Sequence, residues 1–195
     1  MLTIVWDVDD VLNDLMEQWF HRGWKQQHPE CRIQYGELSA NPPHDALGVI
    51  RDVYLESMDA FRRSEAGIQL APNAEALAWF EAHGAKARHI ALTSRPLETA
   101  PDVAAWVMRH FGRWIRCFGV VPSRPPRDAP SYDQNKGEYL RWLGKGDVLV
   151  DDTRENLRAA AEIGIKTLEW PQPWNDSQKT TTMVLCELKE MADSA

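Results

Sequence analysis

The sequence is short of the features that mark secreted, membrane-spanning and nucleic-acid-binding proteins. Its 195 residues include only three cysteines, widely spaced and without a CxxC pair, as is typical of free thiols in a reducing compartment. No apolar run approaches the length of a membrane span, and the N-terminal residues lack the basic and apolar regions of a signal peptide. The net charge of −7 argues against a nucleic-acid polymer as partner. We therefore expect a cytoplasmic protein that binds neither membranes nor nucleic-acid polymers.

Two common motifs for phosphates and cations are also missing. The phosphate-binding pattern GxxxxGK[ST] does not occur. The D-x-D run at the N-terminus does not continue as a calcium-binding EF-hand loop, because Val11 and Gln18 stand where oxygen ligands belong. Any phosphate or metal site must therefore be built in another way, and nothing in the sequence specifies an oligomeric state.

What the sequence does contain is an alternation of short apolar segments with segments of helical period. This alternation predicts an α/β fold, a Rossmann-like parallel sheet between two layers of helices. The expected strands are 2–6, 88–93, 115–121, 147–150 and 165–169, and the expected helices are 73–83, 98–111, 136–143, 153–163 and 177–191. A Pro-rich loop is expected at 123–135.

The alternation is interrupted after the first strand. Two helical patterns, 11–27 and 45–63, lie on either side of a loop at 28–44. We interpret residues 13–70 as a small helical cap inserted into the core, which then comprises residues 1–12 and 71–195.

Oxygen-rich side chains follow three of the predicted strands. Each residue alone has an ordinary explanation as a helix cap or turn former, but a doubled acid at a strand end occurs twice. The carboxyl ends of parallel strands share one edge of the sheet, so carboxylates from two strands would meet there and favour Mg²⁺. A nearby lysine and hydroxyl suit a phosphate. These residues are Asp7 and Asp9, Thr93 and Ser94, Asp151 and Asp152, and Lys136.

The same residues, in the same order, resemble the four motifs of the haloacid dehalogenase (HAD) superfamily of phosphotransferases. The first motif matches DVDDVL from Asp7, the second matches Thr93 in HIALTSRP, and the third matches Lys136 in DQNKGEYL. The fourth matches VLVDDTREN, with Asp151, Asp152 and Asn156. The resemblance spans nearly the whole chain and implies that the first and fourth strands are neighbours.

Within the superfamily, DVDDVLNDL, LTSRP and the PWN at 173–175 are similar to the 5'(3')-deoxyribonucleotidase group. Two positions differ from that group. Asp10 replaces a glycine, and Leu15 stands where the group tends to carry an aromatic residue that stacks on the base. The resemblance implies a phosphomonoesterase of nucleoside monophosphates. The alternatives are a phosphatase of another small phosphorylated metabolite, such as a sugar phosphate, and a module that binds a phospho-ligand without turnover.

The resemblance also implies a role for each motif residue. Asp7 is the expected nucleophile, and Asp9 is the expected acid and base, with a pKa that its surroundings should raise. Thr93 and Lys136 are expected to bind the phosphoryl oxygens, with Ser94 as a further contact.

The implied Mg²⁺ ligands are Asp7, the backbone carbonyl of Asp9, and Asp152, which ranks above Asp151. Asn156 is expected to act through water or by positioning Asp151.

Three further residues are candidates for the walls of the site. Trp19, on the inserted helix, and Arg95, after the second strand, are possible substrate-lining residues, although a core position and a surface position respectively are the simpler explanations. Trp174 follows Pro173 on a loop after the last strand and is placed to close the crevice.

Overall fold

The computed structural model describes residues 1–125 and 128–195, and its centre is a five-stranded parallel sheet. The strands are β1 (Thr3–Trp6), β2 (Arg88–Thr93), β3 (Ile115–Val120), β4 (Val148–Asp151) and β5 (Lys166–Glu169). Their order is β3-β2-β1-β4-β5, so β1 lies between β2 and β4. This order confirms the predicted α/β fold and the predicted pairing of the first and fourth strands.

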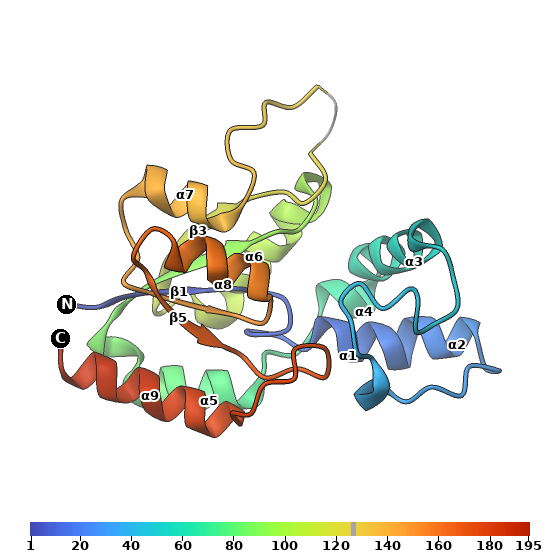
Figure 1. Ribbon diagram of the computed structural model, residues 1–195, viewed down its shortest axis with the longest axis horizontal. Coiled ribbons are helices and arrows are strands. Elements are labelled where there is room, and N and C mark those ends of the chain that lie inside the picture. The colour runs from blue at the N-terminus through green and yellow to red at the C-terminus, as the bar shows by residue number, and fades with distance from the viewer. Residues whose placement is uncertain (126–127) are drawn as a thin grey trace.

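Both faces of the sheet are covered by helices because successive strand residues point to opposite sides. On one face, Ile4 and Trp6 pack with α5 (Ala74–His83), α6 (Ala100–Phe111) and α9 (Thr181–Asp193). On the other face, Val5 packs with α7 (Lys136–Leu143) and α8 (Arg154–Ala161). Figure 1 shows α5 and α9 on one side of the sheet and α7 on the other.

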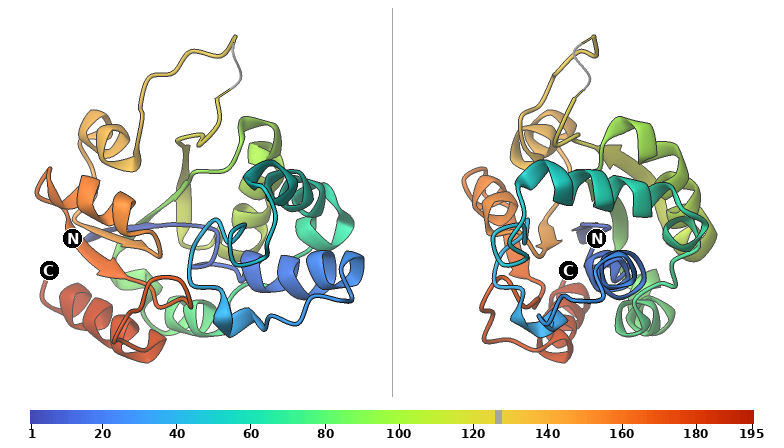
Figure 2. Two further views of the ribbon diagram at one scale, coloured as in Figure 1. Left: turned by 45° about the vertical axis from the view of Figure 1, so that its right-hand side comes forward. Right: turned by 90° about the vertical axis from the view of Figure 1, so that its right-hand side faces the viewer.

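The cap, residues 13–70, forms a separate group of helices beyond the carboxyl end of β1 (Figures 1 and 2). Its elements are α1 (Leu15–Trp19), the π-helix η1 (Phe20–Trp24), α2 (Lys25–Gln27), the 3-10 turn η2 (Tyr35–Glu37), α3 (Arg51–Arg63) and α4 (Glu65–Ile68). They enclose their own cluster of buried side chains, including Trp19, Trp24 and Phe61. The two connections to the core run side by side, since Asn13 forms an isolated β-bridge with Pro72. The division into cap and core as separate units stays a prediction.

Several predicted helices begin later in the structure than expected. The predicted helix 11–27 begins at Leu15 and changes to π-helix at Phe20, and the predicted helix 45–63 begins at Arg51. The predicted helix 98–111 is a 3-10 turn, η4 (Leu97–Thr99), followed by α6, and the last helix is 181–193 instead of 177–191. A short 3-10 turn, η3 (Gly84–Lys86), follows α5.

Part of the Pro-rich loop expected at 123–135, namely 126–127, lies outside the described residues. Among the helices that the structure does describe, none is both long enough and apolar enough to cross a membrane.

Candidate active site

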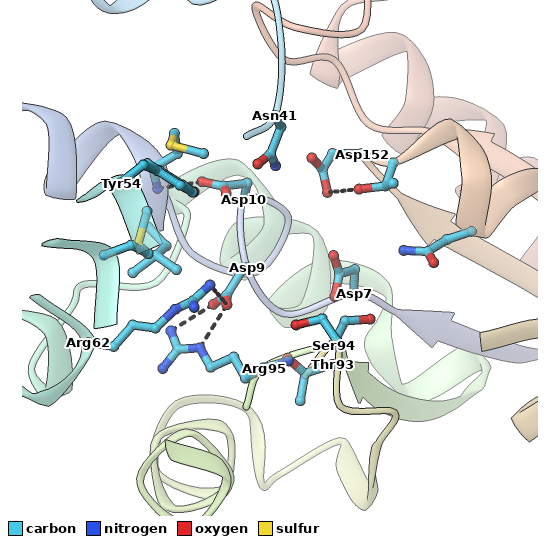
Figure 3. Close-up of a pocket in the computed structure, with 16 residues that line it drawn as sticks. Asp7, Asp9, Asp10, Asn41, Tyr54, Arg62, Thr93, Ser94, Arg95 and Asp152 are labelled. Atoms are coloured by element: carbon cyan, nitrogen blue, oxygen red, sulfur yellow. Dashed lines mark hydrogen bonds and ion pairs between the residues drawn. The ribbon is translucent and has the colours of Figure 1, made fainter. Parts of the chain in front are cut away.

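The polar strand ends meet at one edge of the sheet and line a cleft of about 160 Å³ between core and cap. Asp7 follows β1, Thr93 and Ser94 lie at the end of β2, and Asp152 follows β4 (Figure 3). The cap contributes the opposite wall, with Leu15, Met16, Asn41, Tyr54, Met58 and Arg62. The expected meeting of motif residues at the carboxyl edge is therefore what the fold produces.

Three buried carboxylates form the centre of this edge. Asp7, Asp151 and Asp152 each offer an oxygen, and these oxygens lie within 4.8 Å of one another. Burial, and then the charge of Asp151, raises the pKa of Asp152 to about 8. Burial also raises the pKa of Asp7 well above its usual range, against the opposing effect of Lys136. Carboxylates crowded in this way fit a divalent cation with a preference for oxygen ligands, such as Mg²⁺.

Lys136 is completely buried at the first turn of α7 and joins two of these carboxylates. Its Nζ lies 2.7 Å from Oδ1 of Asp7 and 2.7 Å from Oδ2 of Asp151. Asn156 donates to both oxygens of Asp151 at 3.1 Å, which matches its predicted positioning role. Lys136 is not among the cleft-lining residues, so its contact with a phosphate stays a prediction.

Of Asp151 and Asp152, only Asp152 lines the cleft. A loop after β5 holds its side chain and backbone in place. Trp174 Nε1 donates to Asp152 Oδ2 at 2.7 Å, and Asn175 Nδ2 donates to the Asp152 carbonyl at 2.9 Å. Asp151, by contrast, has no solvent exposure and is occupied by Lys136 and Asn156. The geometry therefore favours the predicted ranking of Asp152 above Asp151 as a metal ligand.

The surroundings of Asp9 differ from the prediction that they raise its pKa. Arg95 donates to both of its oxygens, from Nε to Oδ2 and from Nη2 to Oδ1, each at 2.7 Å. Asn13 adds a hydrogen bond at 3.2 Å to Oδ1. Burial alone would raise the pKa of Asp9, but the guanidinium of Arg95 outweighs it, with help from Arg62, and lowers the pKa. The prediction that the surroundings raise the pKa of Asp9 is therefore wrong for this conformation.

The side chain of Asp9 also lies outside the cluster of Asp7, Asp151 and Asp152 in the part of the chain that the structure describes. The ligand predicted from Asp9 is its backbone carbonyl, and that stays a prediction.

The backbone conformation of Asp10 explains why the resembled motif has glycine at this position. Asp10 has φ of +63°, the left-handed region that favours glycine. Its Oδ1 accepts a hydrogen bond of 2.7 Å from the backbone N–H of Met16, in the first turn of α1. Asp10 therefore caps this helix from five residues before its start.

The three candidate wall residues have different outcomes. Trp174 contacts Asp152 but is not among the cleft-lining residues. Arg95 is 4% exposed and lines the cleft through its contact with Asp9. Trp19 is wrong as a lining residue, because it has no exposed surface and packs edge-on against Tyr54 in the cap core.

The residues that sequence reasoning missed are on α3. Tyr54, Met58 and Arg62 recur every four residues and face the cleft together. A charged residue in register with an apolar helical stripe was the signal that could have found Arg62.

Comparisons with known proteins agree with this fold. No family model and no curated protein matches the sequence. A haloacid dehalogenase-like family hydrolase from Streptococcus pneumoniae has a TM-score of 0.61 and 13% identity, and the match covers 96% of this chain and 90% of that one. A predicted phosphatase from Clostridium acetobutylicum has a TM-score of 0.62 and 9% identity, with coverage of 100% and 99%. A protein provisionally assigned as a beta-phosphoglucomutase from Thermotoga maritima has a TM-score of 0.53 and 16% identity. The match covers 97% of this chain and 99% of that one.

These identities are low, so the likeness concerns the fold. The names of the three neighbours are those of a hydrolase, a phosphatase and a mutase, and they give no support to the nucleotidase group. The chain has the Rossmann-like α/β fold of the haloacid dehalogenase-like hydrolases, with the residues that resemble their four motifs gathered at one edge of its sheet.

Proposed function

We propose that this protein is a Mg²⁺-dependent phosphomonoesterase that works through an aspartyl-phosphate intermediate on a small phosphorylated metabolite. The observation that carries the proposal is the position of Asp7. It lies at the end of the central strand, within 4.8 Å of Asp151 and Asp152 and beside Thr93 and Ser94 at the end of the neighbouring strand. A bound Mg²⁺ would be held by Asp7 and Asp152 and would neutralise charge on the phosphoryl group.

Asp7 would attack phosphorus and release the alcohol, and water would then hydrolyse the aspartyl phosphate. Thr93 and Ser94 would hold phosphoryl oxygens through their hydroxyls. Lys136 orients the attacking carboxylate through its 2.7 Å contact with Asp7. Asp9 can protonate the leaving alcohol only after its two hydrogen bonds with Arg95 open, because they hold it in the charged form.

The size and walls of the cleft favour a compact substrate. A cleft of about 160 Å³ is smaller than the roughly 300 Å³ at which typical ligand pockets begin. Leu15 lines the wall where a base-stacking aromatic would be expected for a nucleotide. The neighbours also include a protein assigned to sugar-phosphate chemistry by its name. A sugar phosphate or another small phosphoester therefore fits better than a nucleoside monophosphate.

A second candidate function is a module that binds a phospho-ligand without turnover. It is favoured because Arg95 occupies both oxygens of Asp9, the expected acid. Purified protein with Mg²⁺ and 4-nitrophenyl phosphate separates the two. We expect hydrolysis that EDTA and Asp7→Asn abolish, whereas Asp45→Asn, at a carboxylate that is 94% exposed, leaves the rate unchanged. Activity that survives Asp7→Asn would exclude the nucleophile, and no turnover of any phosphoester would favour the binding module.

A further inference from the structure

The cleft is electrostatically divided. The strand-end side holds the acidic cluster of Asp7, Asp151 and Asp152. The side toward the cap holds Arg62 from α3 and Arg95 from the loop after β2, which meet at Asp9 (Figure 3). These two arginines, the arginine pair, belong to different parts of the chain and line the same cleft.

The arginine pair shares its carboxylate partners with a third arginine, Arg124. Arg62 lies 3.9 Å from Asp9 and 3.1 Å from Asp59, and Arg95 contacts Asp9 at 2.7 Å. Arg124 also binds Asp59, at 2.7 Å. Three guanidiniums therefore share the carboxylates of Asp9 and Asp59, and the carboxyl of Asp10 also lines this cleft.

Arg62 is the member of the pair with hydrogen-bonding capacity left over. The fork of Arg95 is already matched to both oxygens of Asp9. The Nε of Arg62 is buried and has no hydrogen-bond partner among the described residues, and its Nη2 lies 3.9 Å from Asp9, beyond hydrogen-bonding distance. Nη2 has no hydrogen bond among the described residues, and it is the group through which Arg62 can donate to a ligand in the cleft.

We propose that the arginine pair, and Arg62 above all, binds a second anionic group of the substrate. The substrate class is then a compact phosphoester with a further oxyanion, either a carboxylate or a second phosphate. Guanidiniums suit this role because their planar N–H groups match the oxygens of both groups. The position of the reacting phosphoester rests on the proposed function, while the anion site rests on the contacts of Arg62.

The cleft supports this class because it is small. Asp7 and Asp152 of the acidic cluster line the same cavity of about 160 Å³ as the arginine pair, so one short molecule can reach both sides. The second anion would also join the cap to the core, since Arg62 is on α3 and Arg95 follows β2.

Binding to the Asp7→Asn protein in Mg²⁺, measured by calorimetry, tests the proposal without turnover. The probes are glycerol 3-phosphate, with one anionic group, and 3-phosphoglycerate and propane-1,3-diyl bisphosphate, with two. We expect the two-anion probes to bind at least about tenfold more tightly than glycerol 3-phosphate. This factor corresponds to one hydrogen bond between charged groups. Arg62→Gln should bring the ratio of the affinities for two-anion and one-anion probes close to one. Arg62→Lys should keep part of this ratio. Arg63→Gln, at a neighbour that is 56% exposed, should keep all of it.

A ratio near one with Arg62 present, a ratio that survives Arg62→Gln, or no binding of any probe would overturn the proposal. A merely structural role of Arg62 would weaken all three probes equally and leave the ratio unchanged, which also overturns it. Preference for the carboxylate or for the bisphosphate identifies the second group. Turnover by the protein with Asp7 intact is scored separately, so a preserved ratio without turnover would contradict the phosphatase and not the anion site.

Discussion

At the scale of single residues, two adjacent carboxylates after β1 respond to burial in opposite ways. The pKa of Asp10 is raised well above its usual range by burial and then by the charge of Asp9. The pKa of Asp9 is lowered, because Arg95 outweighs the effect of burial. The difference comes mainly from the guanidinium of Arg95, with a smaller effect of Arg62 on Asp9.

The pair of Asp9 and Arg95 should stabilise the fold. Because the pKa of Asp9 is lower in the folded protein, this stabilisation is complete above the usual value of 3.8 and is lost as the pH falls through the lowered pKa. We expect Arg95→Gln to reduce the free energy of unfolding at neutral pH by about 2 kcal/mol, since it leaves a partly buried carboxylate without its main partner. Urea unfolding measures the change.

Asp9→Asn in the Arg95→Gln background is the matched test of that pair. The double variant should recover part of the lost stability, because no unpaired charge then remains. If the loss of unfolding free energy in the double variant equalled the sum of the losses in Asp9→Asn and Arg95→Gln, a direct interaction between the two residues would be contradicted.

Asp10 combines a strained backbone with a helix cap. We expect Asp10→Ala to lower the free energy of unfolding by about 2 kcal/mol, since alanine is disfavoured at φ of +63° and cannot accept from Met16. Asp10→Gly should cost less, because glycine removes only the cap, and Asp10→Asn should cost least. Thermal or urea unfolding of the three variants gives the order, and a glycine variant less stable than the alanine variant would contradict the backbone argument.

The positions of the site residues could largely be predicted, but their partners could not. Asp7, Thr93 and Asp152 follow strands, and parallel strands end at one edge, so their meeting follows from topology. The contact of Arg95 with Asp9 joins residues 86 positions apart through side-chain geometry that no local pattern encodes. The contribution of Arg62 depends on how the cap sits over the sheet.

At the scale of elements, β1 and β2 are joined by a buried side-chain contact as well as by their ladder. Trp6 Nε1 donates to Nδ1 of His89 at 3.1 Å, so the proton of a neutral imidazole is on Nε2, which lies 2.8 Å from the Gly84 carbonyl. Burial lowers the pKa of His89, and the hydrogen bond to Gly84 offsets this only in part. A second proton would put an N–H against that of Trp6.

This contact predicts a pH dependence of stability. The unfolded imidazole takes up a proton below its usual pKa of 6.5, whereas the folded one resists until lower pH. The stabilisation is therefore complete above pH 6.5 and falls as the pH drops toward the folded-state pKa. Unfolding in urea at about pH 7.5 and about pH 5.5 should show a loss that is smaller in His89→Gln. An equal loss in both proteins would contradict the account.

The beginnings of helices were the least predictable feature of the elements. The apolar period of 11–27 suggests one helix, but Asp10 turns the chain and the backbone N–H groups of Leu12 and Asn13 both bond to the Val8 carbonyl. Helix α1 can begin only after this turn, at Leu15. The strands were easier to place because short buried apolar runs leave few alternatives, as for 88–93.

At the scale of the whole molecule, polar contacts join residues 13–70 to the rest of the chain. Arg62 approaches Asp9, Arg124 binds Asp59, and Trp106 Nε1 donates to the Leu70 carbonyl at 2.7 Å. The presence of helices between β1 and α5 was predictable from the break in the alternation. Which of their side chains face the core was not, because that depends on packing between segments far apart in the sequence.

A search for a phosphoryl group on Asp7 shows directly whether this carboxylate is the nucleophile. The protein is mixed with an excess of 4-nitrophenyl phosphate and Mg²⁺, quenched in acid, and digested for mass spectrometry. We expect a phosphoryl group on the peptide that contains Asp7, absent with EDTA and absent in Asp7→Asn. A phosphoryl group on another residue, or turnover that Asp7→Asn leaves undiminished, would contradict it.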